Sequence, residues 1–431
     1  MINKDLPERQ AEPQSPLEDR ASEKCAEQGK QLLELCRTGK LYEIQNWITN
    51  GKSLDVSAAK KRGKPISLLQ IAIETGFHSL VELIAHNEAS QESKNAALAD
   101  AASARRLDLV ELLLASGADI KSVPLVDVLL TWEPNIIHFF LNRGADVLDG
   151  RPFAVAFGER IRTALRPFLD YKRAHPELAP QLQEQLDCAL RYFCSKGDLK
   201  WVSLLMWAGG DPRSRGPCLN EEYTDDPECY TSGMDEASRS ENPDVLKRLK
   251  PDPTRDDLSK LLRHAASWAR KEILEYLLEI GAHPNDKPNG GSSALDSALR
   301  DLNFAGWEPY GTNRLKPKYK VSRSLDCVRQ LLAHGAVWNS SENHDLNSLR
   351  RSLLECEPDV TIELLRLFRE YSACPAERVH KLLGTPRMKK HLKPEANSLL
   401  RLGIHLDAAP NLKGRSRTNT PGRVDDHGDR S

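Results

Sequence analysis

Cysteines, histidines and glycine-rich segments are the residues of this sequence that could support chemistry. Cys188 with Cys194, and Cys218 with Cys229, could each form half of a zinc site, but neither pair has the short C-x2-C spacing typical of one. There is no G-x-x-x-x-G-K-[ST] phosphate loop, no G-x-S-x-G nucleophile motif and no H-E-x-x-H metal helix. We therefore predict a protein that is not an enzyme and that has no catalytic residues, metal or cofactor.

The composition of the chain further narrows the class of protein it can belong to. The chain has 431 residues, 61 Lys plus Arg against 62 Asp plus Glu, and a net charge of -1. This balance argues against a basic nucleic-acid coat or an acidic tail as the main role of the chain. The first thirty residues hold no apolar run of signal-peptide length, and nowhere is there the run of about 20 apolar residues that a membrane helix needs. With nine scattered cysteines, we expect a soluble, cytoplasmic protein that does not contact membranes.

The helices that must position any functional residue follow a repeated sequence pattern. Apolar residues at i, i+3 and i+4 precede a glycine in five segments, as expected for a helix with one buried face and a left-handed end. The segments are 110–119, 137–146, 202–211, 274–283 and 328–337. Upstream lie shorter helical segments in which pairs such as Ala101-Ala102 and Ala265-Ala266 permit close helix contact. The pattern predicts two antiparallel helices per unit.

Prolines and packing residues refine this prediction. Pro134, Pro243 and Pro358 stand where second helices should begin, and proline at a first helical position loses no helix hydrogen bond. Leu113 should face the core. The tryptophans expected to pack between repeat units are Trp47, Trp201, Trp207 and Trp338, whereas Trp268 is harder to bury. The turns at 104–106 and 269–271 must form without glycine.

These segments resemble ankyrin repeats, whose unit reads approximately T-P-L-H-x-A-A-x-x-G-H followed by a helix ending L-L-x-x-G-A-D. The match is clearest in 67–85, 98–119, 190–211 and 262–283. Tetratricopeptide and HEAT arrays are the alternatives, and the Gly-Ala-Asp ending favours ankyrin. The resemblance implies an all-α, ankyrin-type helix-turn-helix solenoid of about ten units with short hairpin or loop tips.

The expected organisation has three parts. Residues 1–27 and 406–431 are polar and should be disordered, and the repeat array should occupy 28–405. Insertions interrupt the array at 218–230, which is acidic, and at 301–323, which is basic and carries Trp307 and Tyr310. Each insertion is either a functional loop or a solvated one.

The resemblance implies a non-enzymatic scaffold that binds partner proteins of unknown identity on the concave face of the array. Motif position makes the residues before the inter-helix turns candidates for contact, with Trp268 as the main anchor because aromatics dominate interface energetics. Together with the insertion, the predicted partner-binding residues are Arg37, Thr38, Glu74, Thr75, Ser103, Lys196, Trp268, Trp307 and Tyr310. The alternatives are a regulatory or inhibitory subunit of an enzyme, or nucleic-acid contact through the basic-aromatic loop 301–323.

Overall fold

A computed structural model describes residues 16–54, 60–61, 64–65, 67–219, 229–287, 291–302, 317–338 and 343–404. Helices dominate these ranges, in which the only strands are four of two residues each, so the predicted all-α class is confirmed. The chain divides into two compact units. Unit 1 comprises Met1–Phe193 with Lys200–Tyr230, and unit 2 comprises Cys194–Leu199 with Thr231–Ser431.

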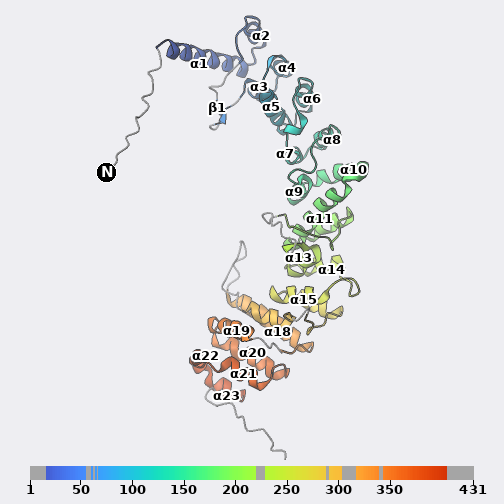
Figure 1. Cartoon of the computed structure of the whole chain (residues 1–431), viewed down its shortest axis with the longest axis vertical. Coiled ribbons are helices and arrows are strands. Elements are labelled where there is room, and N and C mark those ends of the chain that lie inside the picture. The colour runs from blue at the N-terminus through green and yellow to red at the C-terminus, as the bar shows by residue number, and fades with distance from the viewer. Residues whose placement is uncertain are drawn as a thin grey trace, which may run out of the picture. The chain divides into compact units, whose positions relative to one another are not determined.

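Unit 1 is built from pairs of helices that follow one another along the chain (Figure 1). Among the first helices of the pairs, α1 packs on α3, α3 on α5, α5 on α7 and α7 on α9. The second helices α2, α4 and α6 pack in the same order, as do α8 and α10. The helices are α1 (Pro16–Arg37), α2 (Leu41–Thr49), α3 (Leu68–Thr75), α4 (His78–Asn87), α5 (Gln91–Ser103), α6 (Leu107–Ala115), α7 (Leu125–Leu129), α8 (Pro134–Asn142), α9 (Pro152–Gly158), α10 (Leu165–Ala174), α11 (Ala179–Lys196) and α12 (Leu199–Trp207), with the last residues of α11 and the first of α12 in unit 2.

Short elements connect these helices. Strand β1 (Lys60–Lys61) pairs antiparallel with β2 (Lys64–Pro65) between α2 and α3, with Lys61 opposite Lys64. Three single-turn helices, η1 (Ile120–Ser122), η2 (Arg162–Ala164) and η3 (Pro176–Leu178), and strand β3 (Arg215–Gly216) complete the described part of this unit.

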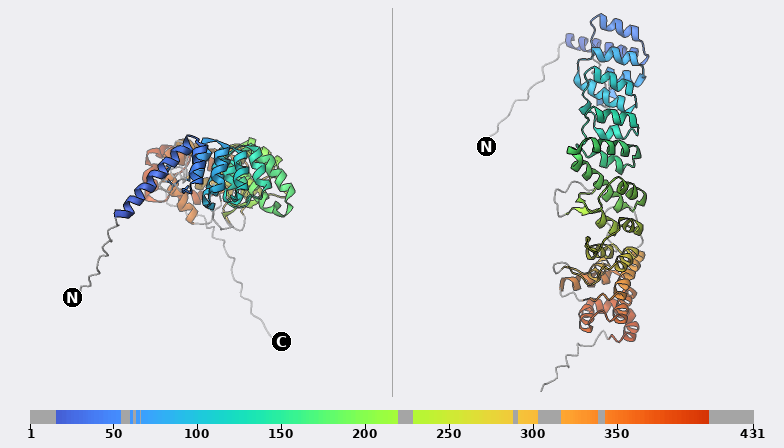
Figure 2. Two further views of the ribbon diagram at one scale, coloured as in Figure 1. Left: turned by 90° about the horizontal axis from the view of Figure 1, so that it is seen from above. Right: turned by 90° about the vertical axis from the view of Figure 1, so that its right-hand side faces the viewer.

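Unit 2 repeats the arrangement, and Figure 2 shows from two more sides that, inside each unit, each pair lies beside the next. First helices α13, α15, α17, α19 and α21 pack in order, and so do second helices α14, α16, α18 and α20. The elements are β4 (Thr231–Ser232), α13 (Gly233–Arg239), α14 (Pro243–Leu249), α15 (Leu258–Ser267), α16 (Lys271–Glu279), α17 (Ala294–Asp301), α18 (Pro317–Ala333), α19 (Asn343–Glu355), α20 (Pro358–Glu370), α21 (Ala376–Leu383), α22 (Pro386–Leu392), η7 (Lys393–Glu395) and α23 (Ala396–Arg401).

The predicted helix boundaries are confirmed at both ends of the second helices. Pro134, Pro243 and Pro358 are the first residues of α8, α14 and α20. After the second helices, the five motif glycines are left-handed, with φ values of +96°, +82°, +93°, +103° and +84° at Gly117, Gly144, Gly209, Gly281 and Gly335. This conformation lets the following residue close the helix, as when Ala118 N–H donates to Leu113 O at 3.0 Å.

The core lies between the helix pairs, and most packing predictions are confirmed. Leu113 is fully buried, and the predicted alanine pairs are buried where first helices meet. Trp47, Trp201 and Trp338 are also buried. The prediction for Trp207 is wrong, because its side chain is 72% exposed. Trp207 follows the buried Leu205 by two positions, which turns it to the opposite face of α12.

Two predicted boundaries differ from the structure. Helix α1 begins at Pro16, so residues 16–27, which were expected to be disordered, are helical. Helix α18 begins at Pro317, so the last residues of the predicted 301–323 insertion are also helical. None of the helices in the described ranges combines the length and apolar character needed to cross a bilayer.

Leu113→Ala tests the register of α6 in the core. The substitution leaves a cavity at a fully buried site, and we expect it to lower the free energy of unfolding of unit 1 by about 2 to 5 kcal/mol. Glu111→Ala changes an exposed residue of the same helix and should have an effect of about 0.5 kcal/mol or less in urea denaturation. Equal effects of the two substitutions would contradict the register.

Gly144→Ala tests the left-handed helix end. No atom lies within 4 Å of an added Cβ, so the cost comes from φ = +82° alone, and we expect a loss of about 1 kcal/mol. Gly29 lies inside α1, also without a neighbour to an added Cβ, and Gly29→Ala should stabilise by about 0.5 to 1 kcal/mol. If both substitutions changed the free energy of unfolding in the same direction in urea denaturation, this explanation would be refuted.

Candidate protein-binding surface

The structure brings the predicted contact residues of unit 1 to the ends of three adjacent helices. Arg37 ends α1, Glu74 and Thr75 end α3, and Ser103 ends α5. Because α1, α3 and α5 pack consecutively, these residues lie along one edge of the unit. Arg37, Glu74 and Ser103 are exposed on this edge.

The threonine hydroxyls at this edge hold the helix ends. Thr38 Oγ1 donates to Glu34 O at 2.7 Å, and Thr75 Oγ1 donates to Ala72 O at 2.7 Å. Thr131 does the same at the end of α7, donating to Val128 O at 2.7 Å. The hydroxyl protons of Thr38 and Thr75 are therefore engaged within their own helices, and a partner could meet only their methyl groups and oxygen lone pairs.

In unit 2 the predicted residues lie at the ends of α11 and α15. Lys196 is the exposed last residue of α11. Trp268 follows the last residue of α15. Its backbone N–H donates to His264 O at 3.1 Å, and its side chain is 54% exposed. Trp307 and Tyr310, the predicted contacts in the insertion, lie outside the described residues.

Hydrogen bonds link three of the inter-helix turns to the preceding turn of the same unit. Arg106 Nη1 donates to Gly76 O at 3.2 Å in unit 1. In unit 2, Asn242 Nδ2 donates to Gly197 O at 2.9 Å, and Arg270 Nε donates to Arg239 O at 2.7 Å. Because these three turns are bonded to their neighbours, the residues on them have defined spacing and can act as a preorganised surface.

The turns that were predicted to form without glycine do so at a cost. Arg105 and Ala269 adopt left-handed φ values of +59° and +51°. Two further turns, unrecognised in the sequence, do the same, with Trp132 and Arg160 both at φ = +61°. A left-handed conformation costs an L-residue with a β-carbon about 1 to 2 kcal/mol. The signal for Trp132 was present, since Glu133-Pro134 marks the start of α8 and places the turn just before it.

Charge at the turn edge is partly neutralised locally. Arg106 binds Asp108 through two hydrogen bonds, Nε to Oδ1 at 2.8 Å and Nη2 to Oδ2 at 2.6 Å. This interaction lowers the pKa of Asp108. In unit 2, Glu241 accepts from Arg270 at 3.0 Å and lies 3.8 Å from Arg323, a cation of the basic 301–323 segment. Arg323 therefore pairs within the fold.

A partly buried polar cluster between α13 and α15 contains serine, histidine and aspartate, but these side chains are not arranged as a proton relay. Asp235 Oδ1 and Ser238 Oγ both lie near Nδ1 of His264, at 3.6 and 3.4 Å. Nε2 of the same ring faces Arg239 Nη2 at 3.1 Å. A Ser-His-Asp relay needs the serine and the aspartate on different ring nitrogens. The cluster therefore packs the two helices together, with Lys260 Nζ 2.8 Å from Asp235.

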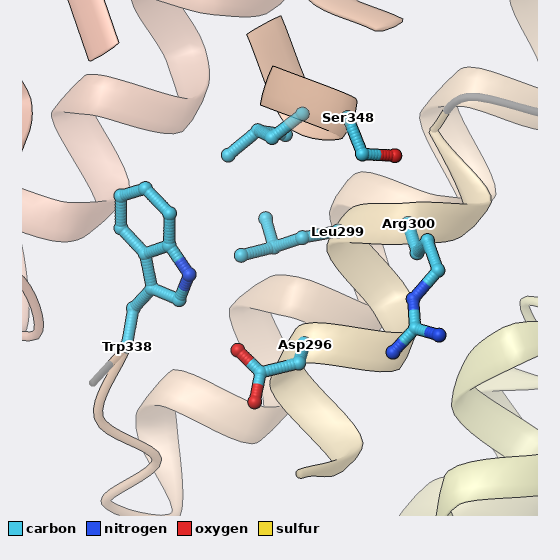
Figure 3. Close-up of a pocket in the computed structure, with 6 residues that line it drawn as sticks. Asp296, Leu299, Arg300, Trp338 and Ser348 are labelled. Atoms are coloured by element: carbon cyan, nitrogen blue, oxygen red, sulfur yellow. The ribbon is translucent and has the colours of Figure 1, made fainter. Parts of the chain in front are cut away.

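A shallow recess in unit 2 is lined by α17, α19 and the residue Trp338 (Figure 3). It encloses about 260 Å³ of empty space, part of it open to solvent. Asp296 Oδ2 accepts from Ser293 N and Oγ at 3.0 and 2.9 Å and so caps α17, while Oδ1 has no partner among the described residues. No histidine, cysteine or second carboxylate lines the recess, so it offers no acid–base pair.

Metal-binding groups are not gathered anywhere in the described ranges, where no set of three or more His, Cys, Asp and Glu side chains could hold an ion. A scan against models of known protein families finds none that matches this chain, and a search of curated proteins finds no significant relative.

The pH dependence of unit 2 tests the buried cluster. Burial, and then the nearby charge of Arg239, lower the pKa of His264 from 6.5 to about 3. The unfolded chain binds this proton below pH 6.5 but the folded chain does not, so stability is lost as pH falls from 6.5 toward 3. We expect about 1 to 2 kcal/mol less stability at pH 5 than at pH 7 from this group.

Comparing the pH dependence of stability in wild type and His264→Gln separates the contribution of His264 from that of the other histidines. Glutamine keeps a hydrogen-bonding side chain that does not titrate, so the variant should lose less stability than wild type between pH 7 and pH 5 in urea denaturation. An unchanged pH dependence in the variant would show that His264 does not carry the proton linkage.

Proposed function

We propose that the chain is an ankyrin-type solenoid that acts as a non-enzymatic scaffold and binds partner proteins on the concave face of its repeats. Support comes from the order of packing, in which first helices contact first helices and second helices contact second helices within each unit. The left-handed glycines after second helices and the β1–β2 hairpin between α2 and α3 suit the same architecture. Because stacked pairs cover each other's apolar faces, their turn edges remain exposed for binding.

The observation that carries the proposal is Trp268. This indole stays 54% exposed at the end of α15, although Ala266 and Ala269 beside it are buried. An exposed tryptophan on a hydrogen-bonded turn loses the stabilisation that burial would provide, and it is the residue type most enriched in binding hot spots. A partner protein that covers this indole would recover that stabilisation.

The cellular setting is part of the proposal. The described cysteine side chains are all free thiols, several of them buried. Free buried thiols suit a reducing compartment, which supports a cytoplasmic location.

Trp268→Ala tests the site against a matched control. Trp207 is also exposed but lies at the end of α12, a second helix, so Trp207→Ala removes an equivalent side chain away from the first-helix ends. In crosslinking pull-downs quantified by mass spectrometry, we expect Trp268→Ala to lower recovery of specific partners about tenfold or more. Trp207→Ala should leave recovery unchanged.

Circular dichroism must show that both variants remain folded. Loss of the same partners with Trp207→Ala alone, or unchanged recovery with Trp268→Ala, would contradict the site assignment.

A further inference from the structure

The C-terminal end of unit 2, formed by α21, α22 and α23 (Figure 1), carries an excess of positive charge. Residues 376–401 contain seven Lys and Arg against two Glu, in a chain whose net charge is -1. Helices α19 and α20, which pack on this end, carry four basic and five acidic residues, and the 405–431 segment adds five basic and four acidic ones. The neighbouring segments therefore do not balance the positive charge of the end.

The need for a polar end cap does not explain the sign of this charge. The first and the last helix pair of a stack each expose a face to water and need polar residues there. The first pair of unit 1, α1 and α2, meets this need with five basic and six acidic residues, and Lys40 lies 3.1 Å from Glu43. Capping thus accounts for the polarity of 376–401 but not for its positive excess.

Three of the cations form a ridge along α22 and η7, which we call the basic ridge. Arg387, Lys390 and Lys393 recur at every third residue, so they lie on one face of this helical segment. All three are exposed, whereas Met388 and Leu392 on the opposite face are buried. With a rise of about 1.5 Å per residue, the ridge extends about 9 Å along the helix axis.

The cations of the basic ridge have no counter-ion in the described part of the chain. None of the three side chains forms an ion pair or a hydrogen bond with another described residue. The two glutamates nearby in sequence are engaged elsewhere, since Glu377 lies 3.6 Å from Lys381 and Glu395 accepts from Ser398 Oγ at 2.8 Å. Like charges three residues apart on a helix repel each other, and a bound polyanion would remove this repulsion.

The residue types at this end favour phosphate groups as the bound anion. Four of its seven cations are lysines, which bind phosphate as flexible point charges. Residues 376–404 contain no Phe, Trp or Tyr that could stack on exposed bases, as single strands require. The ridge face also carries no apolar side chain that could enter a lipid layer. A line of exposed cations suits the regularly spaced phosphates of a duplex.

We propose that Arg387, Lys390 and Lys393 bind the phosphate backbone of a nucleic-acid duplex. The contact is electrostatic and independent of base sequence, because the ridge offers charges to phosphates and no side chain suited to reading base edges. This binding activity goes beyond the proposed scaffold function. It uses a different ligand and a surface at the C-terminal end of unit 2.

Glutamine substitutions remove the charge of the ridge while keeping long side chains that favour helix. The test variant combines Arg387→Gln, Lys390→Gln and Lys393→Gln. The control variant combines three glutamine substitutions at exposed lysines of unit 1, and so changes the net charge by the same amount; these are Lys30→Gln, Lys40→Gln and Lys121→Gln. Lys390→Gln alone provides a milder second variant, and circular dichroism checks that each variant has the helix content of wild type.

The probe is a fluorescein-labelled DNA duplex of about 20 base pairs, titrated by fluorescence anisotropy against the full chain at salt concentrations from about 50 to 200 mM. We expect the logarithm of the association constant to fall linearly with the logarithm of the salt concentration. The slope should become shallower by about 2 to 3 in the triple ridge variant and by about 1 in Lys390→Gln. The control variant should keep the wild-type slope, and a duplex of unrelated sequence should bind equally well.

Several results would overturn this proposal. These are no binding of the duplex at about 50 mM salt, an unchanged slope in both ridge variants, or the same change of slope in the control variant. Tighter binding of polyglutamate than of the duplex would assign the ridge to an acidic protein segment, and tighter binding of anionic lipid vesicles would assign it to a membrane surface. Because the readout is phosphate binding in unit 2, its failure leaves the Trp268 test of the scaffold function intact.

Discussion

A short helix pair in this protein has an apolar face that it cannot cover by itself, and only the neighbouring pairs can cover it. The buried alanines of α5 and α15 let neighbouring first helices approach closely, and Leu113 fills the core between pairs. This constraint accounts for the order in which first helices pack on first helices and second helices on second helices within each unit. It also leaves the inter-helix turns at an edge, where side chains contribute little to the core and can be used to contact other molecules.

Some of the inter-helix turns are ordered by hydrogen bonds, and some hold residues in a strained backbone conformation. Hydrogen bonds such as Arg106 to Gly76 O link three of the turns to the turn before them, so these turns lose little conformational freedom when a partner binds. Among the turns of unit 1, Trp132 is kept in a left-handed conformation, and among those of unit 2, Trp268 is kept exposed. Both features reduce the stability of the free protein, and a bound partner would explain why they are present. The cluster around His264 has the opposite character, because its partly buried polar groups bind one another inside unit 2.

The sequence was sufficient to predict the features that depend on local chemistry. Glycine after an apolar helix, proline at a first helical position and alanine pairs at close contacts each have one strong structural consequence, and all were confirmed. Features that depend on where a helix begins or how it is rotated were missed. Trp207 belongs to an apolar run, but its exposure depends on an offset of two positions from Leu205. Helix α1 begins within a polar segment, where periodicity gives no signal. Trp132 was missed because its turn lacks the expected glycine, although Pro134 marked its position.

Site-specific photocrosslinking measures directly whether partners are recognised along the inter-helix turns. A photoreactive phenylalanine analogue placed at position 132, 268 or 207 of the full chain would report which side chains touch another protein in native extract. We expect crosslinked adducts of defined mass from positions 132 and 268, and none from position 207 on α12. Adducts from position 207 alone would show that partners are not recognised along the turns.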